Sequence, residues 1–75
     1  MKVRLTYVRA LDIDEENDTL LELAEGTTVG EVYDRLDIPP DRQRFVRAVV
    51  NGEKQKAAYE LEEGDNLHLF IHIRS

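Results

Sequence analysis

The chain has 75 residues, a length that fits one small domain with a compact hydrophobic core. It contains no cysteine, which excludes disulfides, thiolate metal sites and a cysteine nucleophile. Sixteen acidic residues outnumber ten basic ones, and the net charge of −6 disfavours non-specific binding to nucleic acid.

The N-terminal part predicts two short strands joined by an acidic connection. Residues 2–8 alternate, with Val3, Leu5 and Tyr7 on one face and Lys2, Arg4, Thr6 and Val8 on the other. Residues 9–18 contain DIDEEND, which lacks the Gly and Glu that an EF-hand loop requires, so we expect a solvated acidic turn. Residues 19–23 predict a second strand, with Leu21 and Leu23 on one face. The opening residues contain no continuous apolar run typical of a signal peptide, and no stretch is long enough to span a membrane, so we expect a cytoplasmic protein.

The stretch TTVGEVYDRL predicts the one substantial helix. Thr28 is a good N-cap, and Glu31 three residues later completes a capping box. One apolar stripe follows at helical spacing, formed by Val29, Val32, Tyr33 and Leu36. Pro39-Pro40 should end the helix soon after this stripe, because proline disfavours helical geometry in the residue before it.

The C-terminal half predicts three further strands. Residues 45–50 form the first, Asn51-Gly52 is a strong hairpin signal, and residues 53–55 pair back. Tyr59–Leu61 could form a single helical turn before a last strand at residues 66–73. On these strands the inward positions are Val46, Ala48, Val50, Leu67, Leu69, Ile71 and Ile73.

The order β-β-α-β-β-β indicates a two-layer α+β domain. The helix has one apolar stripe, which it can bury only against a sheet. We therefore expect a single domain over residues 1–75, with a mixed sheet of four to five strands and one helix packed on one face.

The spaced signature "LLELAEGTTVGEVYDRL … VVNGE … LEEGDNLHLF" resembles the sulfur carriers of the ThiS/MoaD type, which have the ubiquitin-like β-grasp fold. The resemblance implies a sheet whose first and last strands are adjacent in the centre, with the third beside the last. It also implies a mechanism, in which an adenylating enzyme activates the C-terminal carboxylate with ATP and sulfur is then loaded as a thiocarboxylate.

The chain departs from the family pattern at its last residues. The family ends in Pro-Pro and then Gly-Gly, whereas Ile71-His72 stands at the proline positions and Ser75 at the first glycine. We therefore expect that the Gly-Gly tail is absent and that Ser75 is the possible carrier position. A Pro-Pro pair would end strand pairing, while Ile-His can continue it.

The outward side chains of the sheet form the candidate partner-binding face. It mixes apolar and basic groups on an acidic protein, and exposed apolar patches with polar rims mark interaction sites. Self-association through this face and an ordinary half-exposed face without a role are the alternatives. The candidate residues are Arg4, Val8, Phe45, Arg47, Val49, His68, Phe70 and His72.

Other constellations give weaker signals. His68 and His72 would lie about 13 Å apart along a strand, too far to bind one metal ion together. DRQRFVR combines three arginines with one aromatic, a mixture that single-strand binding also uses. No nucleophile–base set or cofactor motif is present, so we expect no enzyme activity, no metal and no cofactor.

The leading hypothesis is a non-catalytic β-grasp protein of the sulfur-carrier type that acts by protein–protein docking. Its partner would be an adenylating enzyme or an enzyme of sulfur transfer or cofactor synthesis, and a homodimer stays open. The first alternative is a genuine sulfur carrier or ubiquitin-like modifier activated at its C-terminus. The second is a small RNA-binding β-grasp module, although the net charge disfavours nucleic acid.

Overall fold

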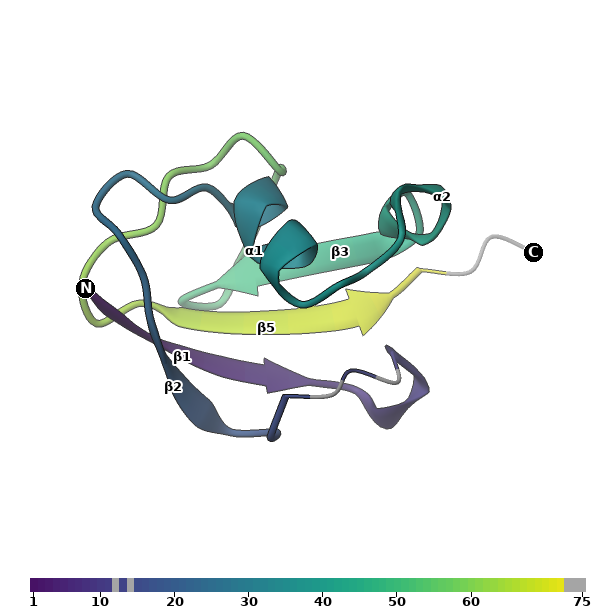
Figure 1. Cartoon of the computed structure of the whole chain (residues 1–75), viewed down its shortest axis with the longest axis horizontal. Coiled ribbons are helices and arrows are strands. Elements are labelled where there is room, and N and C mark those ends of the chain that lie inside the picture. Colours follow the sequence, from purple (N-terminus) through teal and green to yellow (C-terminus); the bar gives the residue numbers. More distant parts are fainter. Residues whose placement is uncertain (12, 14, 73–75) are drawn as a thin grey trace.

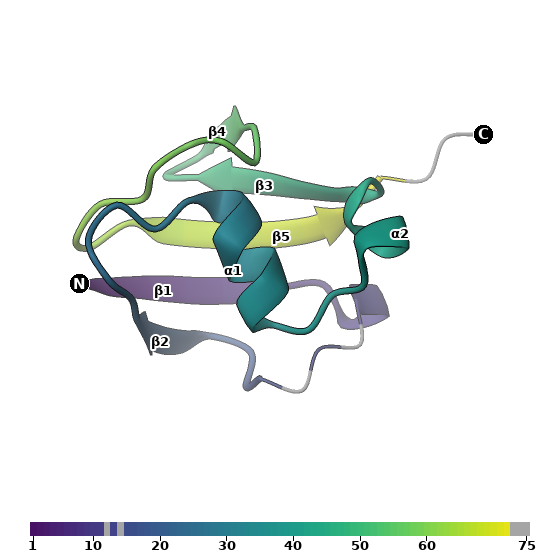
Figure 2. The ribbon, with the colours of Figure 1, turned by 45° about the horizontal axis from the view of Figure 1, so that its top comes forward.

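The computed structural model describes residues 1–11, 13 and 15–72. They form two layers, a five-stranded sheet and a helical layer on one of its faces (Figures 1 and 2). The sheet order is β2-β1-β5-β3-β4. The strands are β1 (Lys2–Tyr7), β2 (Thr19–Glu22), β3 (Val46–Val50), β4 (Glu53–Gln55) and β5 (Asn66–Ile71).

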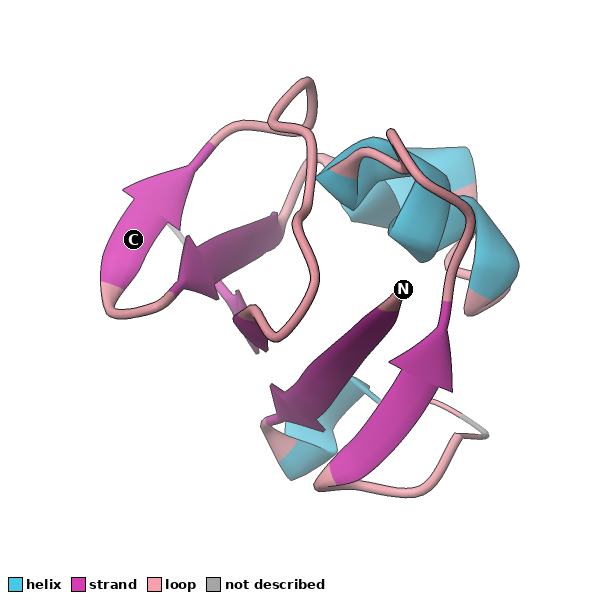
Figure 3. Ribbon diagram, turned by 90° about the vertical axis from the view of Figure 1, so that its left-hand side faces the viewer, coloured by secondary structure: helices cyan, strands magenta, loops and turns pink. Residues whose placement is uncertain are grey.

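The first and last strands lie side by side in the centre of the sheet. β1 and β5 are parallel, with Leu5 opposite Leu67, whereas the other three neighbouring pairs are antiparallel. This arrangement confirms the predicted α+β β-grasp fold and its strand order. Seen along its strands, the sheet is strongly twisted, and the two α-helices lie together on one side of it (Figure 3).

Helix α1 (Val29–Arg35) covers the inner face of the sheet, as its apolar stripe predicts. Its capping box is present, because Glu31 N–H donates to the Thr28 hydroxyl and the Glu31 carboxylate accepts from the Thr28 N–H. Val29, Val32 and Tyr33 are buried against the sheet. The helix therefore begins and packs where local sequence and amphipathicity both place it.

A second, short helix follows where only a stop was expected. In α2 (Pro40–Gln43), proline stands at the first helical position, where its missing N–H costs nothing. The two prolines thus end one helix and begin the next. A 3₁₀ turn, η1 (Arg9–Leu11), also follows β1 and buries Leu11.

The core lies between α1 and the inner face of the sheet. Every inward position predicted on β1, β3 and β5 is buried or half-buried among the described residues; Ile73 lies outside them. The most deeply buried side chains are Val3, Leu5, Val29, Val32, Val50, Leu67 and Leu69. Among the described helices none is long and apolar enough to cross a membrane.

The connection before β5 differs from the prediction. Tyr59–Leu61 does not form a helical turn; Glu60 makes an isolated antiparallel bridge with Thr28, and Leu61 N–H donates to the Thr27 carbonyl over 2.9 Å. Pairing with the segment that leads into α1 satisfies these backbone groups and buries the Leu61 side chain. The prediction was wrong because this partner is distant in sequence.

One buried carboxylate ties the β3–β4 hairpin to the turn before β5. Asp65 accepts from the Asn51 side-chain amide at 2.9 Å and from the Glu62 N–H at 2.8 Å. Asn51 and Gly52 have φ values of 52° and 87°, as the predicted Asn-Gly turn requires. The hairpin turn is therefore held both by its own backbone and by a side chain 14 residues away.

Candidate functional site

The outer face of the sheet turns away from the helices. We use this term for the outward side chains of the five strands between Arg4 and Phe70. They alternate with the core residues and are exposed or half-buried. The strand registers bring together side chains from all five strands, namely Arg4, Thr6, Leu20, Arg47, Val49, Lys54, His68 and Phe70.

The centre of this face is an ordered cluster on β1 and β5. The Thr6 hydroxyl and His68 Nδ1 are 2.8 Å apart, which joins the two central strands at the position where their registers match. The His68 and Phe70 rings stack with their centroids 6.4 Å apart and an angle of 23°. Val49 lies opposite His68 on β3 and extends the apolar surface. These contacts orient the side chains of Thr6, His68 and Phe70 on the surface of the sheet.

Basic side chains flank the cluster on both sides. The Arg4 guanidinium forms an ion pair with Asp18 over 2.7 Å, and both side chains are largely exposed. On β3, Arg47 Nη1 donates to the carbonyls of Arg44 and Val46 at 2.7 and 3.0 Å. The apolar centre therefore has a polar rim, with an ion pair on the β1 side and the positive charge of Arg47 on the β3 side.

Two of the predicted residues lie away from the centre of this face. Val8, predicted to point outward with Arg4, follows β1 and packs partly against the core. Its N–H donates to the Leu69 carbonyl over 3.1 Å, which continues the parallel ladder between β1 and β5. His72 is exposed just beyond β5, where its N–H donates to the Phe45 carbonyl. Ser75, the possible carrier position, lies outside the described residues.

Phe45 lies at the end of the sheet rather than in its middle. Its side chain is 42% exposed, and the Arg44 guanidinium lies 4.8 Å from the ring centroid. Phe45, Leu36, Ile38 and Ile71 line a cavity of ≈ 320 Å³ between α2 and the sheet. The outer face therefore continues, through Phe45, into an apolar hollow that alternation alone does not predict.

Leu20 belongs to the outer face but was missed by the sequence reasoning. It lies opposite Arg4 on edge strand β2 and is 56% exposed, the most exposed large apolar side chain among the described residues. The signal was available, because an inward Leu21 places Leu20 outward. Leu20 adds an exposed apolar side chain on β2, separated from Val49 and Phe70 by the polar outward residues Arg4 and Thr6 of β1.

An ion pair fixes the start of β1 beside β2. The Met1 amino group lies 3.0 Å from the Glu22 carboxylate and donates to the Leu23 carbonyl at 2.6 Å. Hydrogen bonding to Glu22 raises the pKa of the amino group, and the same bond lowers the pKa of the Glu22 carboxyl. This end of the sheet is thus acidic but locally paired.

Comparison with protein families matches residues 7–73 to the ThiS family. Comparison with curated proteins gives no match. Among solved structures, small archaeal modifier protein 1 of H. volcanii is similar with a TM-score of 0.72 and 19% identity, over 96% of this chain and 98% of that one.

Two further similar structures are named as subunits of molybdopterin-converting factor. The putative subunit 1 from Pyrococcus furiosus has a TM-score of 0.74 and 21% identity, over 97% of this chain and 99% of that one. A chain of the complex of subunits 1 and 2 from Helicobacter pylori has a TM-score of 0.63 and 13% identity, over 100% and 99%. At these identities the likeness is one of fold.

Proposed function

The chain belongs to the ThiS family, and we propose that it acts by docking onto a protein partner through the outer face of its sheet. Members of this family are sulfur carriers and small modifiers, so the chain is not an enzyme. The docking role goes beyond family membership, and it depends on the side chains of the outer face.

The observation that supports docking is the composition of this face. Val49 and Phe70 give a half-exposed apolar centre with Arg47 beside it, and Leu20 adds an exposed apolar side chain on β2 next to Arg4. Interface cores are depleted in charge and enriched in aromatic residues and arginine. The positive charge of Arg47 beside this apolar centre, on a protein of net charge −6, favours a partner that places an acidic group next to an apolar patch.

One of the similar structures supports the proposal that the partner is a protein. The Helicobacter pylori structure is a complex of the two subunits of a molybdopterin-converting factor, in which a protein of this fold assembles with another protein. We propose a protein partner for this chain as well, namely an adenylating enzyme or an enzyme of sulfur transfer or cofactor synthesis. Such a partner would recognise the folded sheet, not an unfolded segment.

The test measures binding to the adenylating enzyme from the same organism by calorimetry. Phe70→Asp, which places a charge at the apolar centre, should weaken binding by at least about tenfold, because hot spots are central and desolvated. Glu62→Ala is the control for a substitution away from this face, since its side chain is exposed at the far end of the sheet. Equal affinity of wild type and Phe70→Asp would refute docking through this face.

Family membership also supports a second function, that of a genuine sulfur carrier or modifier. In that case the enzyme and ATP would add an adenylate to the C-terminal carboxylate with release of pyrophosphate, and a sulfur donor would replace it by a thiocarboxylate. Intact mass spectrometry after incubation with enzyme, ATP and sulfide separates the two functions. A gain of adenylate or of sulfur supports the carrier, whereas binding without a mass change supports docking alone.

A further inference from the structure

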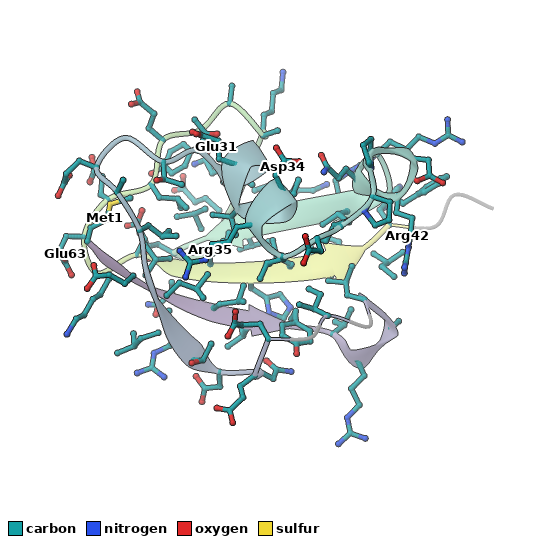
Figure 4. All side chains as sticks on the ribbon, in the orientation of Figure 1. Met1, Glu31, Asp34, Arg35, Arg42 and Glu63 are labelled. Atoms are coloured by element: carbon teal, nitrogen blue, oxygen red, sulfur yellow. The ribbon has the colours of Figure 1, made fainter. Side chains whose placement is uncertain are left out.

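The charge of the molecule is unevenly distributed along the chain. Residues 42–56 carry five basic side chains and one acidic one, whereas the remainder carries five basic and fifteen acidic ones. Figure 4 shows Arg42 at one end of the molecule and Glu63 at the other. The part formed by α2, β3 and β4 is therefore a positive region on an acidic protein, which favours an acidic ligand at that place.

In the same region, edge strand β4 is shorter than its neighbour. β5 pairs with all of β3 from Val46 to Val50, but β4 pairs only with Ala48, Val49 and Val50. Beyond Ala48, the ladder on the β4 side stops. One side of the β3 backbone at Val46 thus lies at the edge of the sheet.

The backbone of Val46 faces this edge. Its neighbour Phe45 accepts from His72, and Asn51 donates to the Asn66 carbonyl, so the odd-numbered residues of this segment pair toward β5. In an antiparallel ladder the intervening residues pair toward the opposite side. The Val46 carbonyl accepts from Arg47 Nη1 at 3.0 Å, so a side chain stands where a strand partner would be.

A groove with a volume of ≈ 460 Å³ lies along this edge. Val46 and Ala48 line its floor together with Tyr33 of α1, and Arg47, Lys54 and Lys56 also line it. Among the described residues, ion pairs join only the Met1 amino group to Glu22 and Arg4 to Asp18, so these three basic groups have no carboxylate partner there. The groove continues the line of β4 and combines a strand edge with positive charge.

We propose that this groove, which we call the edge groove, binds an extended acidic segment of a protein partner. The segment adds a strand beside β3 at Val46, and its carboxylates contact Lys54, Lys56 and Arg47. Main-chain hydrogen bonds give such strand addition its affinity, and alternate side chains give its specificity. Arg47 leaves the Val46 carbonyl and pairs with a carboxylate, a stronger charge-assisted bond.

The geometry favours a peptide over single-stranded RNA, the other anionic polymer. RNA binding without sequence preference needs aromatic faces on which bases stack. In the edge groove the aromatic residue is Tyr33, which is 4% exposed, and the Phe45 ring lies against Arg44 instead. A strand edge, by contrast, matches the donor and acceptor spacing of a peptide.

The inference rests on the proposed function only in taking the ligand to be part of a protein. Arg47 and Lys54 belong to both the edge groove and the outer face, but Phe70 does not line the groove, so the apolar centre of the outer face can be changed separately. Phe70→Ala, which adds no charge opposite Arg47, should leave binding of a peptide to the groove unchanged. The two proposals can therefore fail independently.

The first experiment titrates the full chain into a fluorescein-labelled seven-residue peptide of alternating valine and glutamate, followed by anisotropy. The variant Lys54→Glu/Lys56→Glu should weaken binding by about tenfold or more, since it reverses two charges beside the ligand. Lys2→Glu/Arg9→Glu makes the same change in net charge elsewhere and should have little effect. Equal losses in both variants, or none in either, overturn the proposal.

The second experiment asks whether the peptide binds as a strand. A peptide N-methylated at alternate residues keeps its charge but cannot complete the ladder, and it should lose about tenfold in affinity. In hydrogen exchange followed by NMR, the Val46 amide should become protected when the unmodified peptide binds. Unchanged affinity of the methylated peptide, no protection of Val46, or tighter binding of oligouridine than of the peptide each overturns strand addition.

Discussion

The two faces of the sheet are built from alternate residues of the same strands, but their side chains have different contacts. On β5, Leu67 and Leu69 are buried beneath the helix, while His68 and Phe70 between them are half-buried on the other side. The inner face contacts only the protein itself. The outer face contacts the protein through a few ordered pairs, such as Thr6 with His68, and leaves the rest of its surface to solvent.

The difference shows which residues the fold needs and which it leaves available for binding. Burial of apolar surface provides most of the stability of a chain this short, and α1 covers only one face. Apolar side chains on the uncovered face therefore add little to folding. Their presence there is the reason to assign the outer face to a partner.

The largest effect should come from the inner face. Leu69→Ala removes a side chain that is 0% exposed at the centre of the core and should lower the free energy of unfolding by about 3–4 kcal/mol. Urea unfolding followed by circular dichroism measures the change. A loss below about 1 kcal/mol would mean that the inner face does not dominate stability as the comparison requires.

The next largest effect should come from Asp65, the one charged side chain that is buried among the described residues. Asp65→Ala leaves the Asn51 amide and the Glu62 N–H without their acceptor and should cost about 1–3 kcal/mol. The same urea experiment measures it. Glu62→Ala serves as the control, because only its backbone takes part, and it should change stability by less than about 0.5 kcal/mol.

Phe70 follows Leu69 on β5 but lies on the outer face, so its loss should lower the free energy of unfolding less. Phe70→Ala should cost about 1 kcal/mol or less, since it loses mainly its stacking with His68. In the calorimetric assay the same variant should bind the partner more weakly than Leu69→Ala, provided that both are folded. If Phe70→Ala destabilises the chain as much as Leu69→Ala, the two faces are not distinct.

The smallest effect at neutral pH should come from Tyr33, in the helical layer above the inner face. Burial raises the pKa of its phenol, so the folded state keeps the proton to a higher pH than the unfolded state. Tyrosine therefore contributes stability below about pH 10 that is lost as the pH rises through the folded pKa. Melting temperatures from pH 8 to 12 should fall less steeply for Tyr33→Phe than for wild type; parallel curves would contradict this.

The sequence predicted well those elements whose signals are local. The capping box at Thr28 and Glu31 and the Asn51-Gly52 turn were read correctly because each depends on residues within a few positions. The order of the strands followed from the family resemblance, and the sheet topology confirms it. The alternation of side chains along the strands then predicted most of the residues of the outer face.

The features that were missed depend on contacts between distant residues. Glu60 pairs with Thr28 instead of forming a helical turn, and Val8, expected on the outer face, packs partly against the core. The edge groove could not be found from periodicity, because it exists only where β4 stops short of β3's first residues. Local patterns describe which way a side chain points, but not where a neighbouring strand ends.

The parallel pair of β1 and β5 at the centre of the sheet also sets the order in which the protein can form. The first strand made by the ribosome has its central neighbour more than sixty residues later in the chain. Contacts of such high sequence separation slow folding, because a long loop must close before they form. During synthesis, the β1–β2 hairpin must therefore wait with one edge unpaired, and the domain completes its sheet only when β5 emerges. Until then this edge is open to pairing with other chains.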